Sequence, residues 1–187
     1  MQKIGEAQYL YSPSDLVHFL SCNHSIVLNL KSFSEQIEKA EDSASNKLLQ
    51  NKGYAHEAAY LAKLKADGKR VVEIPKQPKL PERVELTKQA LQSGVDVVYQ
   101  GVLFNGQWRG DADFLIRVET PSKLGAFSYE VLDTKLARHA KITALLQIAG
   151  YADALQIMGI PMAPTARLVL GDGKEAEYPI ADLIPVY

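Results

Sequence analysis

The segment Tyr129-Glu130-Val131-Leu132-Asp133-Thr134-Lys135 is the part of the sequence that decides the fold. Aromatic and β-branched residues dominate its start, so it predicts a β-strand. Side chains alternate between the two faces of a strand, so Asp133 and Lys135 are expected on the same face. A carboxylate and an ammonium in an apolar strand are costly to bury unless they pair or bind something. The segment therefore predicts both a sheet and a charged site at its end.

A predicted hairpin comes just before this strand. Residues 97–104 form a largely apolar run, and residues 108–118 are expected to return beside them. Between the two lies Asn105-Gly106, which is typical of the centre of a type I′ turn. After a loop over 119–126, the third core strand is expected over 127–135.

The returning strand carries Gly110-Asp111-Ala112-Asp113. If it neighbours the strand 127–135, Asp113 and Asp133 meet near a shared end. Two clustered carboxylates repel one another unless a cation lies between them, and hard oxygen ligands favour Mg²⁺ or Mn²⁺. The alternative is that both acids are solvated at strand ends, but Lys135 on the same face favours a site. Asp111 is either a supporting acid or exposed, and Trp108 and Arg109 either line a phosphate path or lie on the surface.

The remaining sequence predicts helices and short strands around this hairpin. Helical spacing and capping residues indicate helices, whereas short β-branched runs bounded by Pro or Gly indicate strands. We expect helices over 13–30, 45–66, 82–92 and 142–158, strands over 71–74, 167–170 and 176–180, and a loop or exposed helix over 31–46. The apolar stripe of 45–66 is expected to be Leu48, Leu49, Ala55, Ala58, Ala59 and Ala62. The predicted fold class is α/β, with a small mixed β-sheet flanked by helices.

Two helices carry further candidate site residues. His56 is either a structural histidine or a third metal ligand, because the small residues beside it would let its helix approach the sheet, and Glu57 is a less favoured substitute. Gly53 in the same helix indicates either close approach by another group or a helix break. Gln147 and Tyr151 are four residues apart, so they share one helix face. They either form the polar edge of a helix packed on the sheet or contact a phosphate or a base.

Composition narrows the classes of protein without selecting one. The chain has 187 residues, 47% of them hydrophobic, which suits a globular fold. A net charge of −1 argues against a protein that coats nucleic acid non-specifically. The single cysteine, Cys22, excludes an intrachain disulfide, a four-thiolate zinc site and a self-contained iron–sulfur cluster. No stretch predicts a membrane span or a signal peptide, so the expected location is cytoplasmic.

Taken in order, the motifs resemble those of the PD-(D/E)XK nuclease superfamily, and within it the RecB-like nucleases. The resemblance rests on a helix-borne histidine, a Gly-x-x-Asp motif, an Asp-x-Lys motif and a Gln-x-x-x-Tyr motif, found here as His56, Gly110–Asp113, Asp133–Lys135 and Gln147–Tyr151. It spans about Tyr11 to Leu155, and the opening Ser12–Leu16 is similar to the start of RecB-like domains fused to helicases. Some RecB-like exonucleases carry a four-cysteine iron–sulfur cluster, for which this chain has only Cys22.

The resemblance implies a restriction-endonuclease-like core and a single domain over 1–187, as part of a longer helicase-containing protein. It implies a metal-dependent exonuclease that acts on single-stranded or end-processed DNA in repair or recombination, leaving a 5′-phosphate and a 3′-hydroxyl. His56, Asp113, Asp133 and the carbonyl of Thr134 would hold one or two Mg²⁺ or Mn²⁺ ions. Lys135 would orient the attacking water, while Gln147 and Tyr151 would position the strand.

Two other interpretations remain open. The first is a nucleic-acid-binding module of the same fold without catalytic activity, although every motif position is filled here. The second is a structural or partner-docking domain in which the charged cluster is a buried salt-bridge network. That interpretation does not explain why the four motifs occur in this order.

Overall fold

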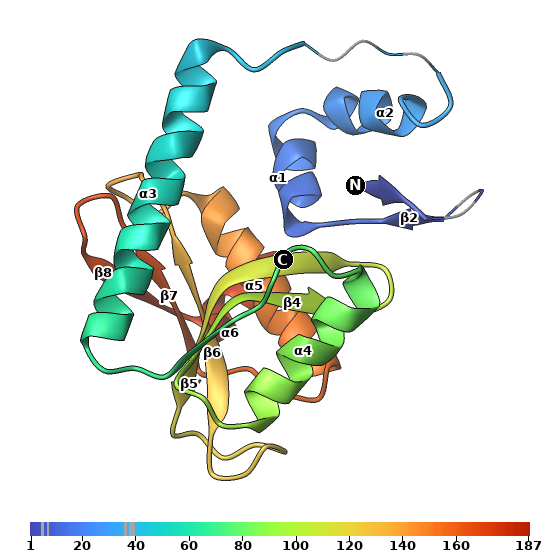
Figure 1. The fold of residues 1–187 in the computed structure, drawn as a ribbon. Helices are drawn as coiled ribbons and strands as arrows, with labels where there is room; N and C mark the ends of the chain where they lie inside the picture. The colour runs from blue at the N-terminus through green and yellow to red at the C-terminus, as the bar shows by residue number, and fades with distance from the viewer. Residues whose placement is uncertain (5, 7, 36, 38–39) are drawn as a thin grey trace.

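The computed structural model describes residues 1–4, 6, 8–35, 37 and 40–187, and its central feature is a six-stranded mixed sheet (Figure 1). The strands lie in the order β3-β4-β5-β6-β7-β8. β4, β5 and β6 form an antiparallel meander, while β3 and β7 add in parallel on either side of it and β8 is antiparallel at the edge. Their bounds are Val71–Glu73, Val97–Phe104, Arg109–Val118, Ser128–Thr134, Thr165–Val169 and Glu175–Pro179. The predicted α/β class with a mixed sheet is confirmed.

Helices cover both faces of this sheet, and the strand residues alternate between the two layers. Val97 and Leu132 pack in the layer that contains residues of α3, whereas their neighbours Val98 and Val131 pack in the layer that contains α4 and α5. Because both faces are covered, the central strands are apolar on both sides rather than alternating with polar residues. The helix bounds are Ala44–Ala66 for α3, Leu80–Gln92 for α4 and Ile142–Ile157 for α5.

The N-terminal part of the chain lies beside the sheet rather than in it (Figure 1). It contains a two-stranded pair and two helices, and the strand pair was not predicted. Their bounds are Gln2–Lys3 for β1, Tyr9–Leu10 for β2, Pro13–Ser21 for α1 and Asn23–Lys31 for α2. At the other end of the chain, α6 (Ile180–Leu183) and a 3₁₀ turn (Ile184–Val186) follow β8 and were not predicted either. No helix in the described ranges has both the length and the apolar character needed to cross a bilayer.

The single helix predicted over 13–30 is wrong, because Cys22 interrupts it. Cys22 has an extended backbone, with φ −164° and ψ 105°, and separates α1 from α2. The Ser25 hydroxyl donates to the Cys22 carbonyl at 2.7 Å. Such local bonds from serine compete with helical hydrogen bonding, which accounts for the break. The region predicted as a loop or exposed helix over 31–46 is in part the end of α2 and the start of α3, and its residues 36, 38 and 39 lie outside the described residues.

The predicted helix over 45–66 is confirmed as α3, but its predicted apolar stripe is wrong. Leu48 and Leu49 are more than half exposed, and none of the four alanines of that stripe is buried. Tyr60 and Leu64 are buried instead. The first half of α3 extends beyond the sheet (Figure 1), and its second half packs on the sheet through Tyr60 and Leu64, which leaves Ala58, Ala59 and Ala62 exposed.

Two further local expectations need correction. The helix predicted to be amphipathic over 142–158 is α5, which is buried on most sides because the sheet, α1 and the C-terminal turn all pack on it. In the β4–β5 turn, the Asn105 N–H donates to the Trp108 carbonyl, so Gly106 and Gln107 form its centre, one position later than expected. The Asn105 side chain accepts from the Gln107 and Trp108 N–H groups, which holds this alternative turn.

Gly53 lies within α3, and its substitution tests whether the helix is continuous at this position. A Cβ at this position would have no atom within 4 Å, and the helix continues through it, so neither close approach nor a break explains the glycine. We expect Gly53→Ala to stabilise the protein by about 0.5–1 kcal/mol, which raises Tm by about 1–4 °C in a thermal melt.

Gly68, just after the same helix, is the control. A Cβ on Gly68 would likewise have no atom within 4 Å, but the φ of this residue is +78°. Gly68→Ala should therefore lower Tm, because an L-residue is strained in this conformation. A loss of stability in Gly53→Ala would contradict the conclusion that α3 continues through Gly53 with open space beside it.

Candidate active site

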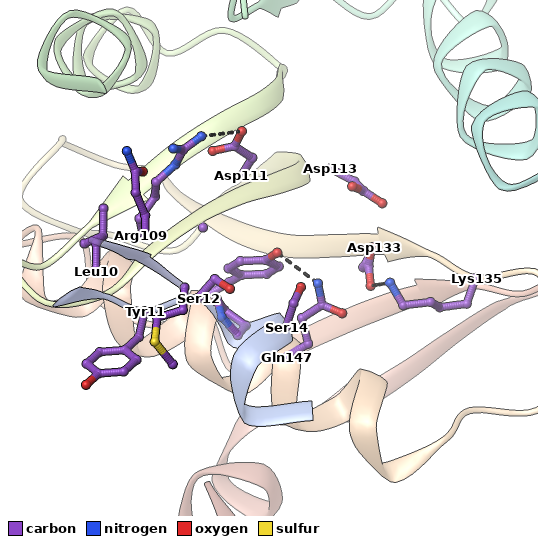
Figure 2. A pocket seen from close by; sticks show the side chains of 15 residues that line it. Leu10, Tyr11, Ser12, Ser14, Arg109, Asp111, Asp113, Asp133, Lys135 and Gln147 are labelled. Carbon is purple, nitrogen blue, oxygen red and sulfur yellow. Dashed lines mark hydrogen bonds and ion pairs between the residues drawn. The ribbon is translucent and has the colours of Figure 1, made fainter. Parts of the chain in front are cut away.

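A polar pocket of about 470 Å³ lies at one end of the β5–β6 pair (Figure 2). Its walls come from β5, the end of β6, one face of α5 and the segment that leads from β2 into α1. Five residues predicted from the sequence line this pocket together: Asp113, Asp133, Lys135, Gln147 and Tyr151.

The register between β5 and β6 brings the two acids together. Phe114 pairs with Leu132 in the antiparallel ladder, so the next position outward sets Asp113 opposite Asp133. The Thr134 N–H donates to both carboxylates, at 3.2 Å to Asp113 Oδ2 and 3.0 Å to Asp133 Oδ1. The Thr134 hydroxyl also donates to Asp113 Oδ2 at 3.2 Å. Two carboxylates thus converge on one backbone donor.

Burial makes this arrangement electrostatically costly. The Asp133 side chain is 2% exposed, and its Oδ2 accepts no hydrogen bond, although Lys135 Nζ forms an ion pair with it. Burial raises the pKa of Asp113 well above its ordinary value, and the charges of Asp133 and Glu57 raise it further, while Lys135 opposes them. The carboxylates of Asp113, Asp133 and Glu57 thus bring together more negative charge than Lys135 balances, which favours the binding of either a proton or a cation.

Burial distinguishes the Asp133–Lys135 motif from other copies of the same spacing in the chain. The same spacing occurs at Asp67–Lys69 and Asp172–Lys174. Asp67 lies at the exposed end of α3, and Lys174, which pairs with Asp172, is 80% exposed. Of these copies, the one at Asp133–Lys135 has its acid buried in a central strand and its lysine in the pocket.

On the α3 side, Glu57 faces the acids and His56 does not. Glu57 Oε1 accepts from the Tyr99 hydroxyl at 2.7 Å and from Gln100 Nε2 at 2.5 Å. His56 Nε2 lies 3.4 Å from the Val169 carbonyl and lines a separate hollow beside Tyr60. Adjacent helix residues point about 100° apart, so only one of the two can face the cluster. The structure does not bring His56 together with Asp113 and Asp133.

Gln100 is a residue of this site that the sequence interpretation missed. It is buried, and its φ of +56° is in the left-handed region that non-glycine residues rarely adopt. The β4–β5 register passes from the Tyr99–Phe114 pair to the Gly101–Ala112 pair, which leaves Gln100 and Asp113 out of the ladder. The sequence indicated this residue only through its amide side chain, which is the single amide within the apolar run 97–104. Strained backbone of this kind is concentrated at functional sites.

The motifs on β5 and α5 are in direct contact. A Cβ on Gly110 would lie 2.2 Å from Cε1 of Tyr151, so glycine at this position lets α5 approach β5 closely. Gln147 Nε2 donates to the Tyr151 hydroxyl at 3.0 Å (Figure 2). Burial raises the pKa of Tyr151, and Asp133 and Asp113 add to the effect. The phenol therefore keeps its proton and can donate it within the pocket.

Asp111 forms an ion pair with the buried arginine Arg83. Its Oδ2 accepts from Nη2 of Arg83 at 3.0 Å and lies 3.5 Å from Nη2 of Arg109. The Arg83 side chain is only 5% exposed, and its Nε donates to the Pro75 carbonyl. Asp111 thus serves as the counter-charge of a buried arginine and contacts a second arginine at the pocket wall.

Comparisons with known proteins identify no relative: no protein-family model matches the sequence, and no curated protein matches it. Within the described residues, no three His, Cys, Asp or Glu side chains gather into a group that could hold a metal ion. Asp113 and Asp133 are the two pocket carboxylates that converge on Thr134.

The repulsion between the carboxylates of Asp113 and Asp133 lowers the free energy of unfolding, so its removal can be measured in a thermal melt. We expect Asp113→Asn to raise the Tm of metal-free protein at pH 8, by about 2–4 °C for each 1 kcal/mol gained. The folded-state pKa of Asp113 is raised, so the wild type loses stability as the pH rises through it. The difference between variant and wild type should accordingly shrink as the pH falls toward the ordinary value of 3.8.

Asp111→Asn is the matched control on the same strand. It should lower Tm, because buried Arg83 loses its counter-charge. Thermal melts of all three proteins in EDTA across this pH range provide the measurement. Equal destabilisation by both substitutions would contradict the repulsive cluster.

Proposed function

We propose that this chain is a divalent-metal-dependent nuclease that hydrolyses phosphodiester bonds in DNA, built on a restriction-endonuclease-like core. The observation that carries the proposal is the pair of carboxylates of Asp113 and Asp133, which converge on the Thr134 N–H at the wall of a polar pocket. Asp133 is 2% exposed and paired with Lys135, so a divalent cation would balance the remaining negative charge of the two acids. The sequence resemblance to RecB-like nucleases supports the same reaction.

The residues fit a hard divalent cation. Asp113, Asp133 and the carbonyl oxygen of Thr134 would hold Mg²⁺ or Mn²⁺, which both prefer oxygen ligands. When bound, such an ion supplies Lewis acidity to a phosphoryl group. Glu57 adds negative charge from the α3 side and is better placed than His56 to support the ion.

The protein's own groups would handle the substrate and its protons. Lys135 reaches from the pocket wall to Asp133, so its ammonium can orient an attacking water and offset charge that grows on the phosphate. Gln147 and the neutral phenol of Tyr151 provide donors on the α5 wall that can hold phosphate oxygens. DNA with a free end or a single strand is the proposed substrate, and repair or recombination the proposed setting.

Cleavage of end-labelled single- and double-stranded DNA tests this proposal, with Mg²⁺, Mn²⁺ or EDTA present. We expect metal-dependent cleavage by the wild type and a loss of about 100-fold or more in Asp133→Ala and Lys135→Ala, because each removes a group that stabilises the transition state. Asp133→Asn, which keeps the side-chain shape, should lose activity as well.

The Asp-x-Lys copy at Asp172–Lys174 supplies matched controls. Asp172→Ala and Lys174→Ala remove the same residue types from an exposed turn and should retain wild-type activity. Absence of cleavage with every metal, together with DNA binding that is indifferent to Asp133→Ala and Lys135→Ala, would overturn the proposal. That result would favour the binding module without catalytic activity.

A further inference from the structure

An apolar hollow of about 290 Å³ adjoins the polar pocket. Its walls include Tyr11, Leu16, Phe19, Ile26 and Trp108, and it shares Tyr11 with the polar pocket. Its volume is close to the lower end of the range of about 300–1,000 Å³ for small-molecule sites. A polar pocket on one side and an apolar aromatic hollow on the other match the two halves of a nucleotide, its phosphate and its base.

The aromatic pair of this hollow is held in place by backbone bonds. The Tyr11 N–H donates to the Gln107 carbonyl at 2.9 Å, and the Arg109 N–H donates to the Tyr11 carbonyl at 2.8 Å. The rings of Tyr11 and Trp108 lie 5.6 Å apart between centroids and are tilted by 41°. Both residues are only half-buried, so part of each ring remains open to a ligand.

Arg109 lies between the hollow and the acids. It follows Trp108 directly in the chain, lines the polar pocket and has a side chain that is 34% exposed. Asp111 is shared between Arg83 and Arg109, so two arginines face one carboxylate and this wall keeps a net positive charge. In Figure 2, Arg109 and Tyr11 lie on the side of the pocket away from Asp133 and Lys135. A phosphate beside Arg109 would thus lie between the acids and the aromatic pair.

We infer that the hollow binds an unstacked nucleobase of single-stranded DNA, with the phosphate of the same strand held at Arg109. This inference rests on the proposed nuclease function and assigns its substrate class. A base in a duplex is paired and stacked, whereas a base in a single strand can turn out and stack on Tyr11 and Trp108. Stacking on aromatic side chains tolerates any base, so the site selects a strand form rather than a sequence.

Trp108 reports directly on this hollow, because it is the only tryptophan of the chain. The full-length protein in EDTA would be titrated with a thymidine 12-mer, an abasic 12-mer with the same backbone and a blunt duplex of equal length. We expect the 12-mer with bases to quench the tryptophan fluorescence and to bind about 10-fold or more tightly than the abasic strand. The duplex should not quench it.

Variants identify the residues that bind the base, and the affinity of each variant is measured by the fluorescence anisotropy of a labelled 12-mer. Trp108→Ala and Tyr11→Ala should each weaken binding about 10-fold and remove the difference between normal and abasic strands, while Trp108→Phe should retain it. Tyr54→Ala is the matched control, because Tyr54 is an aromatic residue of α3 that is 64% exposed and lies outside both pockets. Its binding should equal that of the wild type.

Equal affinity of wild-type protein for normal and abasic strands would overturn the inference, and this comparison does not depend on any variant folding. Equal quenching by the duplex would overturn the single-strand assignment. Because binding is measured without metal, the two proposals fail separately. Base-dependent binding without cleavage under any metal would reject the nuclease alone, whereas cleavage that requires Asp133 but no base-dependent binding would reject the hollow alone.

Discussion

The site depends on one backbone amide, the N–H of Thr134, on which the carboxylates of Asp113 and Asp133 converge. This convergence exists only because Phe114 pairs with Leu132 in the β5–β6 ladder. A slip of one residue would turn the side chains of a strand to its other face, so the register has to be fixed elsewhere. Apolar layers on both faces of the sheet provide that constraint and offset the cost of burying two like charges.

Close packing of the helices against the sheet then brings the other site residues to the pair of carboxylates. Tyr151 reaches the pocket because Gly110 leaves no side chain between α5 and β5. Glu57 is held by Tyr99 and by Gln100, whose left-handed backbone interrupts the neighbouring ladder. Each of these contacts joins segments that are far apart in the sequence, so the pocket is a property of the assembled sheet and not of any one element.

Sequence reasoning was most successful where alternation along a strand decided the outcome. The shared face of Asp133 and Lys135 follows from strand geometry, and the shared face of Gln147 and Tyr151 follows from helix geometry. The approach of Asp113 to Asp133 also required the expected pairing of their strands, which the register supplies. Helix orientation was harder to predict. Alanine drives little burial, so α3 turns Tyr60 and Leu64 to the sheet and presents Glu57 where His56 was expected.

The beginning of the chain could not be placed from its sequence for a different reason. Its strands are two residues long, too short for a periodic signal, and the break between α1 and α2 lies in the extended backbone of one residue, Cys22. Gln100 escaped notice because its importance lies in a backbone angle and a distant partner, neither of which leaves a pattern in neighbouring residues.

One wall of the pocket comes from Tyr11, Ser12 and Ser14, which belong to this N-terminal part and not to the sheet. α2 buries none of its residues, and α1 buries only Pro13 and Asp15. Segments with so little buried surface open at a lower free energy than the core, as amide hydrogen exchange would register. The pocket therefore has one wall that opens at a lower free energy than β4, β5 and β6, while the backbone bonds of Tyr11 to Gln107 and Arg109 hold the end of that wall against the sheet.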